Sequence, residues 1–464
     1  MYLNVRAKGE KIAITLALNN IEGSLVMLDA SLNDEAAWNG FLRENRRRVE
    51  VDLAEVERVI DLARRTPGLS AYDEGLQQLS IFFQVATQWY RDNAPNDLPD
   101  LVQFWERYRA AVIQRFTGIT TVELRAADKV VTDIFTRFIQ AVPNERIAYS
   151  EDATPLVYGG EGGLGAYFTH PPGWNRPFAI INLPHAAFDN VWQWLALPHE
   201  TGHDIYATVE GLQAEVEEAL AQRMQQAVAD GDVEIPAVEV PLNTPWGPYT
   251  VQYEPEELLA TIWRSWANES QADIIGLLNC GGAAVAALQQ IIGFGALDEW
   301  QITPGDGGAI TDAPEEHPTS YVRNAFNISA LRLIGQIAMA DQLEARFAAL
   351  RPEADSIVWF AAPSLPLVEI PTDAMIQSAE IAADVLVNQA FESLGDQSYG
   401  DVAGFAAEDQ ALVEAMVPGL VAGDPTFAQE PGSTARHALA ATMLALESDR
   451  NAGDVINRTF RHFV

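Results

Sequence analysis

Apolar residues recur three and four positions apart along much of this chain, which is the spacing of one face of an α-helix. Residues 51–63 are a clear example. Similar runs cover residues 72–92, 99–116 and 120–141. We therefore expect a helical lobe from about residue 34 to 142. Ahead of it, residues 11–18 are rich in β-forming side chains and a second such run follows a turn, so residues 2–30 are expected to form a β-hairpin.

The pattern then changes to short strands. Segments 166–170 and 178–183 lie on either side of a Pro-Pro-Gly turn and are expected to pair as an antiparallel hairpin. Strands are also expected at 146–150 and 156–158. The glycine-rich stretch 159–165 lacks the helix and the Lys-Ser/Thr pair that follow a phosphate-binding loop, so a turn or an open loop is favoured.

Helical spacing returns in the second half of the chain. Residues 188–197 and 205–228 follow it, and the proline-rich stretch 231–254 is expected to be an ordered connector or an excursion into β structure. Further helices are expected at 256–278, 282–293, 319–349, 373–394, 405–416 and 433–447. The predicted fold class is therefore α+β and predominantly α-helical.

Composition narrows the range of functions. The chain has 464 residues, and 65 acidic side chains against 29 Lys and Arg give a formal net charge of −36. An electrostatic field of that sign repels a phosphate backbone, so we expect no nucleic-acid partner. The hydrophobic fraction of 48% and the charged fraction of 20% are typical of a soluble globular protein.

The chain also carries little that points to export or to a membrane. Its single cysteine, Cys280, excludes an intrachain disulfide, and its first residues lack the layout of a signal peptide. The most apolar run, 274–297, contains Asn279 and Gln289, which favours a buried helix over a membrane span. A cytoplasmic location without a membrane partner is therefore expected. The oligomeric state is left undetermined.

The chain contains one H-E-x-x-H pattern, His199-Glu200-Thr201-Gly202-His203. On a helix, residues four apart lie one turn apart on the same face, so both imidazoles can direct a nitrogen at one Zn²⁺ ion. Glu200 lies about 100° round the helix from His199, beside the metal. It can take a proton from a water there and pass it to a leaving amine. The alternative is a pair of ordinary helix histidines.

A second pattern, Asn268-Glu269-x-x-x-Asp273, lies on an expected helix among apolar residues. Two carboxylates in apolar surroundings require partners, because a buried unpaired charge is costly. Glu269 can complete a His₂Glu zinc site with the fourth position open to water. Asp273 can accept the remaining N–H of a ligand histidine and fix its tautomer. The alternative for Glu269 is an exposed helix carboxylate.

Together the two motifs resemble those of the gluzincin metallopeptidases, the thermolysin-like and neprilysin-like zinc proteases. The resemblance covers about residues 160–325 and leaves the subgroup open. It implies zinc ligands at His199, His203 and Glu269, a general base at Glu200, and Asp273 in the surrounding shell with Asn268 beside it. It also implies a zincin fold, in which a small twisted sheet lies over the active-site helix and helical lobes surround both.

The resemblance extends to residues that would assist the transition state. Gluzincins place a histidine after the third ligand as a donor to the oxyanion, and in neprilysin-like members an arginine that holds a substrate carbonyl follows it. His317 and Arg323 resemble that arrangement, with Tyr321 as an alternative donor. The alternative is a helix-start histidine and a surface or salt-bridge arginine. The remaining histidines, for which we expect structural roles, are His170, His185, His437 and His462.

Zincins bind a peptide by adding its backbone to the edge strand of the upper sheet. The corresponding stretch here is 165–168, which places Ala166, Tyr167 and Phe168 against the substrate. An internal strand is the alternative. We expect three units: the N-terminal hairpin and helical lobe (1–143), the upper subdomain with the sheet and the HETGH helix (144–235), and a helical lower subdomain (236–464).

The sequence thus predicts a zinc-dependent metallopeptidase with one Zn²⁺ ion, acting on a peptide or protein substrate. In this hypothesis a water at the metal, deprotonated by Glu200, attacks the scissile carbonyl. The alternative is a zincin-like protein that is catalytically silent and serves in binding or regulation. The two hypotheses differ in the cleft, which the active enzyme requires to be open beside the metal.

Overall fold

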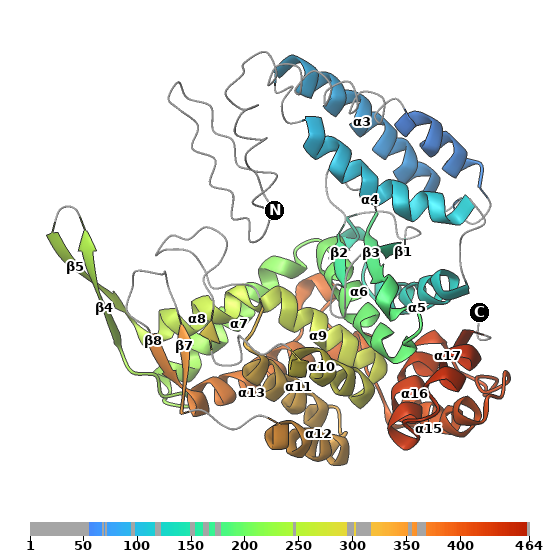
Figure 1. Ribbon diagram of the computed structural model, residues 1–464. Coiled ribbons are helices and arrows are strands. Elements are labelled where there is room, and N and C mark those ends of the chain that lie inside the picture. The colour runs from blue at the N-terminus through green and yellow to red at the C-terminus, as the bar shows by residue number, and fades with distance from the viewer. Residues whose placement is uncertain are drawn as a thin grey trace, which may run out of the picture.

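The computed structural model describes residues 55–66, 69, 72–93, 98–116, 122–148, 154–160, 167–171, 178–244, 247–294, 301–302, 317–350, 355–359 and 368–461. Within these residues the fold is predominantly helical, with three small sheets (Figure 1). The coarse prediction of a mainly α-helical α+β protein is confirmed. The expected hairpin at 2–30 lies outside the described residues. None of the described helices is long and apolar enough to cross a membrane.

The first described helices form a layer of their own. A helix over residues 55–64 precedes α3 (Asp73–Asn93) and α4 (Leu98–Phe116), which lie together in Figure 1. Their apolar faces share one core cluster with part of the central sheet. Tyr108 on α4 anchors the contact, because its buried hydroxyl donates to the carbonyl of Phe178 over 2.7 Å.

The central sheet has three strands in the order β1-β3-β2: β1 (Leu156–Gly160), β2 (Phe168–His170) and β3 (Ile180–Pro184). β3 pairs with β1 in parallel and with β2 antiparallel, and Thr169 lies opposite Ile181. The expected antiparallel pairing is confirmed. β2 is therefore an edge strand of this sheet, although it begins at Phe168, and Ala166 lies outside the described residues.

The H-E-x-x-H pattern lies on α6 (Ala196–Thr208). Pro198 is the third residue of this helix, where a missing N–H breaks no intrahelical hydrogen bond. The helix expected at 188–197 is instead one short 3₁₀ segment, Val191–Leu195, that leads into α6, and a separate 3₁₀ turn, His185–Ala187, precedes it. After α7 (Leu212–Ala229), the proline-rich stretch forms an antiparallel hairpin, β4 (Val238–Thr244) and β5 (Gly247–Tyr253), that projects from the body (Figure 1).

The remaining segments are mainly helical. Helix α5 (Val122–Ile139) and the 3₁₀ turn Asn144–Arg146 precede the sheet, and a second 3₁₀ turn spans Glu392–Leu394. A small sheet joins β6 (Gln301–Ile302), β7 (Ser356–Trp359) and β8 (Val368–Pro371). The other helices are α8 (Pro255–Ser265), α9 (Ala267–Cys280), α10 (Gly282–Phe294), α11 (Ser320–Leu333), α12 (Ile337–Leu350), α13 (Thr372–Asn388), α14 (Tyr399–Ala403), α15 (Ala407–Ala422), α16 (Ala435–Ser448) and α17 (Gly453–Arg461).

Two of the long expected helices are interrupted. The helix expected at 256–278 breaks at Trp266, which separates α8 from α9. The helix expected at 319–349 breaks before α12 at Gly335, whose φ of +82° belongs to the left-handed region that glycine adopts without steric cost. The periodicity of a single segment does not reveal either break.

Helix α9 lies at the centre of the larger core. All of its residues except Asn268 are buried. One apolar cluster joins it to segments from α5 to α17, including α6. Helix α5 thus shares its core with α6, whereas α3 and α4 share theirs with β1 and with residues from Phe178 to Ile180. The expected division at residues 143 and 235 stays a prediction.

Candidate metal centre

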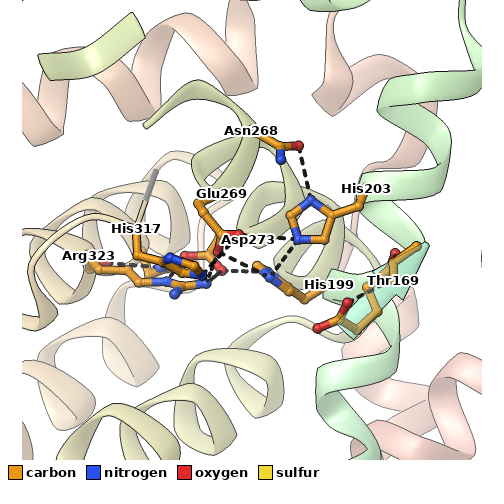
Figure 2. A network of polar contacts seen from close by, with 10 residues as sticks. Thr169, His199, His203, Asn268, Glu269, Asp273, His317 and Arg323 are labelled. Atoms are coloured by element: carbon orange, nitrogen blue, oxygen red, sulfur yellow. Dashed lines mark hydrogen bonds and ion pairs between the residues drawn. The ribbon is translucent and has the colours of Figure 1, made fainter. Parts of the chain in front are cut away.

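His199 and His203 lie one turn apart on the face of α6 that meets α9. Their Nε2 atoms are 3.2 Å apart, and their ring planes are nearly perpendicular at 88° (Figure 2). The three residues between them, Glu200, Thr201 and Gly202, are buried. The four-residue spacing therefore does what the sequence predicts, because it directs both imidazole edges towards one point.

Glu269, from the first turn of α9, supplies a third donor at that point. Its Oε2 lies 3.4 Å from Nε2 of His199, and its Oε1 lies 3.4 Å from Nε2 of His203. Donor atoms of the three side chains all lie within 4.8 Å of one another. A tetrahedral Zn²⁺ with bonds of about 2.0–2.1 Å has donor–donor distances of about 3.3–3.4 Å. The three predicted ligands thus lie close to the spacing of such a site, with a different oxygen of Glu269 nearest each imidazole.

The outer nitrogen of each histidine faces an oxygen. Nδ1 of His199 lies 2.8 Å from Oδ1 of Asp273, and Nδ1 of His203 lies 3.0 Å from Oδ1 of Asn268. With its proton on Nδ1, each ring keeps the Nε2 lone pair directed at the shared point. Asp273 thus lies beside His199, and Asn268 lies beside the second histidine in the same way.

Arg323, on α11, binds the carboxylates of Asp273 and Glu269. Its Nε and Nη2 donate to the two oxygens of Asp273 over 2.8 and 2.7 Å, and Nη2 also lies 3.1 Å from Oε2 of Glu269. Asn327 adds a 2.9 Å hydrogen bond to Asp273. Arg323 is buried with these partners. Its expected contact with a substrate carbonyl stays a prediction, since much of the guanidinium is used within the site.

This network governs the charges of the site. Burial alone would raise the pKa of Asp273, but the charge and hydrogen bonds of Arg323, with His199, hold that pKa well below its usual range. The pKa of Glu269 is also held well below its usual range, because His199 and Arg323 outweigh the effect of burial. Burial would lower the pKa of His199, yet Asp273 and Glu269 raise it to about 10. A metal ion would therefore have to displace a proton from this imidazole.

Glu200 is buried, with 6% of its surface exposed, and it lies in the wall of the same cavity as the two histidines. Its Oε2 accepts a hydrogen bond of 2.8 Å from Oγ1 of Thr169 on β2 (Figure 2). Sequence reasoning missed Thr169. The alternation of side chains along a strand could have found it, because the residue after a solvent-facing Phe168 must face the helix.

The cavity over the three donors has a volume of about 930 Å³ and is open to solvent. Tyr167 and Phe168 of the predicted edge stretch contribute to its wall, as do His317 and Arg323. His317 has 52% of its side chain exposed, and its Nε2 lies 3.4 Å from Oε1 of Glu269. The structure therefore brings His317 to the site.

Tyr321 has a different position. It is not part of the wall that the described residues form around the cavity, and its ring lies 6.1 Å from that of Phe347. His437 is buried on α16, where its Nε2 lies 2.8 Å from Asp409. His170 and His185 do not line the described part of the cavity, and His462 lies outside the described residues.

No protein-family model matches the chain, and neither the curated proteins nor the solved structures provide a match.

Proposed function

We propose that this chain is a zinc-dependent metallopeptidase with a zincin-like core, in which His199, His203 and Glu269 hold one Zn²⁺ ion. One observation carries the proposal: three donors with the spacing of a tetrahedral zinc site lie in an open cavity that also contains a buried carboxylate, Glu200. A structural zinc site needs neither the open side nor the extra carboxylate.

The protein side chains have separable tasks. When bound, the metal ion would act as a Lewis acid and make an adjacent water more acidic. Glu200 takes the proton of the attacking water on its carboxylate and later delivers it to the leaving nitrogen. His317, half-exposed beside Glu269, donates to the oxygen that becomes negative as the carbonyl is attacked. Arg323 keeps Asp273 and Glu269 ionised, so both stay available to their imidazole and metal partners.

A peptide in extended conformation fits the surroundings of the site. Among the described strands β2 pairs with β3 alone, so its other edge carries backbone groups that can pair with a substrate strand. Tyr167 and Phe168 at this strand contribute to the cavity wall, and Phe168 has 39% of its surface exposed. A peptide lying along β2 would run past Glu200, which Thr169 joins to the same strand.

The test separates metal binding from catalysis. Purified protein is expected to contain one zinc per chain by elemental mass spectrometry and to cleave members of a quenched-fluorescence peptide library. Glu200→Gln is expected to keep the zinc and to lose at least about a hundredfold in kcat, the range of general acid–base contributions. Glu269→Ala is expected to lose zinc and activity together.

Glu210→Gln provides a matched control, because Glu210 is an exposed carboxylate just beyond the end of α6. It should retain both zinc and activity. Zinc-loaded protein that cleaves no library member would favour the silent, binding form of the fold. Activity retained by Glu200→Gln would refute the assignment of the general base.

A further inference from the structure

The strand that borders the cavity has two kinds of side chain on its two faces. Phe168 points outward and is exposed, whereas its neighbours Tyr167 and Thr169 are partly buried. Residues two apart on a strand share a face, so both hydroxyl-bearing side chains lie on the face opposite to that of Phe168. Contacts between β2 and α6 place this face against the helix that carries Glu200.

Thr169 makes two contacts to the same residue. Its Oγ1 lies 2.8 Å from the carboxylate oxygen Oε2 of Glu200 and 2.8 Å from the backbone oxygen of Glu200. A hydroxyl has one proton to donate, and an ionised carboxylate is the stronger acceptor. The hydrogen bond therefore goes to Oε2 whenever Glu200 is ionised, and the carbonyl contact keeps the hydroxyl close to the helix.

The contact matters because a glutamate side chain is flexible. Its three rotatable bonds allow many orientations, and each must be suppressed if one oxygen is to face a water at the metal. Among the described residues, Thr169 is the side chain that donates to the Glu200 carboxylate. With Oε2 engaged in this way, Oε1 is left as the oxygen that can accept a proton.

We propose that Thr169 is a positioning residue for Glu200: its hydroxyl fixes Oε2 and so presents Oε1 to the water that is deprotonated. This inference rests on the proposed peptidase function. It goes further in linking the base to the substrate strand, because Thr169 pairs with Ile181 of β3 within the edge strand that a peptide would join. A peptide that pairs with β2 and fixes its position would also fix the position of Glu200 through Thr169.

The kinetic test uses three variants of the zinc-loaded full chain. Thr169→Val keeps the shape and removes the hydroxyl, Thr169→Ser keeps the hydroxyl, and Thr442→Val removes a buried hydroxyl that bonds to the Leu439 carbonyl on α16. We expect Thr169→Val to lower kcat about tenfold with KM changed less than about twofold, consistent with a lost hydrogen bond to a charged group. Thr169→Ser should recover most of kcat, and Thr442→Val should leave kcat unchanged.

A second readout does not need activity. Crystal structures of the metal-free proteins are expected to show one Glu200 rotamer in the wild type and in Thr169→Ser, and several in Thr169→Val. If the wild type cleaves no peptide, the proposed function fails. The Glu200 rotamers in the crystal structures still test whether Thr169 positions Glu200. Either of two results overturns the inference: an ordered Glu200 in Thr169→Val, or a kcat loss that Thr169→Ser shares in full.

Discussion

Gly202 of α6 lies against Ala272 of α9 so closely that a methyl group on Gly202 would come within 2.7 Å of the Ala272 Cα atom. These two residues set the separation of the helices that carry the three proposed zinc ligands. The separation in turn sets the 3.4 Å distances between Glu269 and the two imidazoles. The glycine within the H-E-x-x-H pattern is thus a requirement of packing, distinct from the roles of its neighbours.

Gly202→Ala is expected to destabilise the protein by about 1–3 kcal/mol, the usual cost of adding a methyl group where a close-packed core must move to accept it. The displaced helix should also bind zinc more weakly. Chemical unfolding and a zinc competition titration would measure the two effects.

Gly276→Ala serves as the steric control for this change. A methyl group there would lie 3.6 Å from the backbone nitrogen of His199, which is an ordinary contact. Because alanine also favours a helix over glycine, the variant should fold with unchanged or slightly greater stability. Equal stability of the two variants would show that the α6–α9 separation does not depend on Gly202.

Asn268 and Asp273 each contact the outer nitrogen of one histidine, but their removal should have different effects on zinc affinity and folding stability. Asn268→Ala deletes the acceptor for Nδ1 of His203, and we expect zinc affinity to fall about 10–100-fold with little change in folding stability. Asp273→Ala also leaves Arg323 buried without its main counter-ion, so it should cost about 3–5 kcal/mol of stability.

Chemical unfolding and a zinc competition titration distinguish these outcomes. Asn268→Ala should mainly lower zinc affinity, whereas Asp273→Ala should also lower folding stability. Asp273→Asn, which keeps the shape and an amide oxygen, is intermediate between the wild type and Asp273→Ala. An Asn268→Ala variant less stable than Asp273→Ala would contradict the view that Arg323 depends on Asp273.

Acid should weaken the contact between α15 and α16. Burial would raise the pKa of Asp409, but hydrogen bonds from His437 and the Ala406 amide, with the charge of Arg436, lower it to about 2. Because the folded pKa lies below the unfolded one, this stabilisation is present above about pH 4 and is lost as the pH falls towards 2.

We therefore expect the difference in unfolding free energy between wild type and Asp409→Asn to narrow as the pH falls from about 5 to about 3. Urea unfolding at several pH values would measure it. A difference that stays constant over this range would mean that ionised Asp409 contributes nothing specific to the fold.

The sequence by itself determined the features that depend on local periodicity. Helical spacing predicts a mainly α-helical protein, and the four-residue interval between His199 and His203 makes them neighbours once α6 forms. Alternation and the Pro-Pro-Gly turn predict the pairing of β2 with β3. The second motif pointed to Glu269, Asp273 and Asn268, and these side chains do lie beside the two imidazoles.

Tertiary structure alone decided how distant segments meet. The breaks at Trp266 and Gly335, the binding of Arg323 to Asp273, and the exclusion of Tyr321 from the described cavity wall depend on how the helices pack together. Thr169 reaches Glu200 only because β2 lies across α6. Such contacts join residues far apart in sequence, and their geometry depends on close packing that no local pattern encodes.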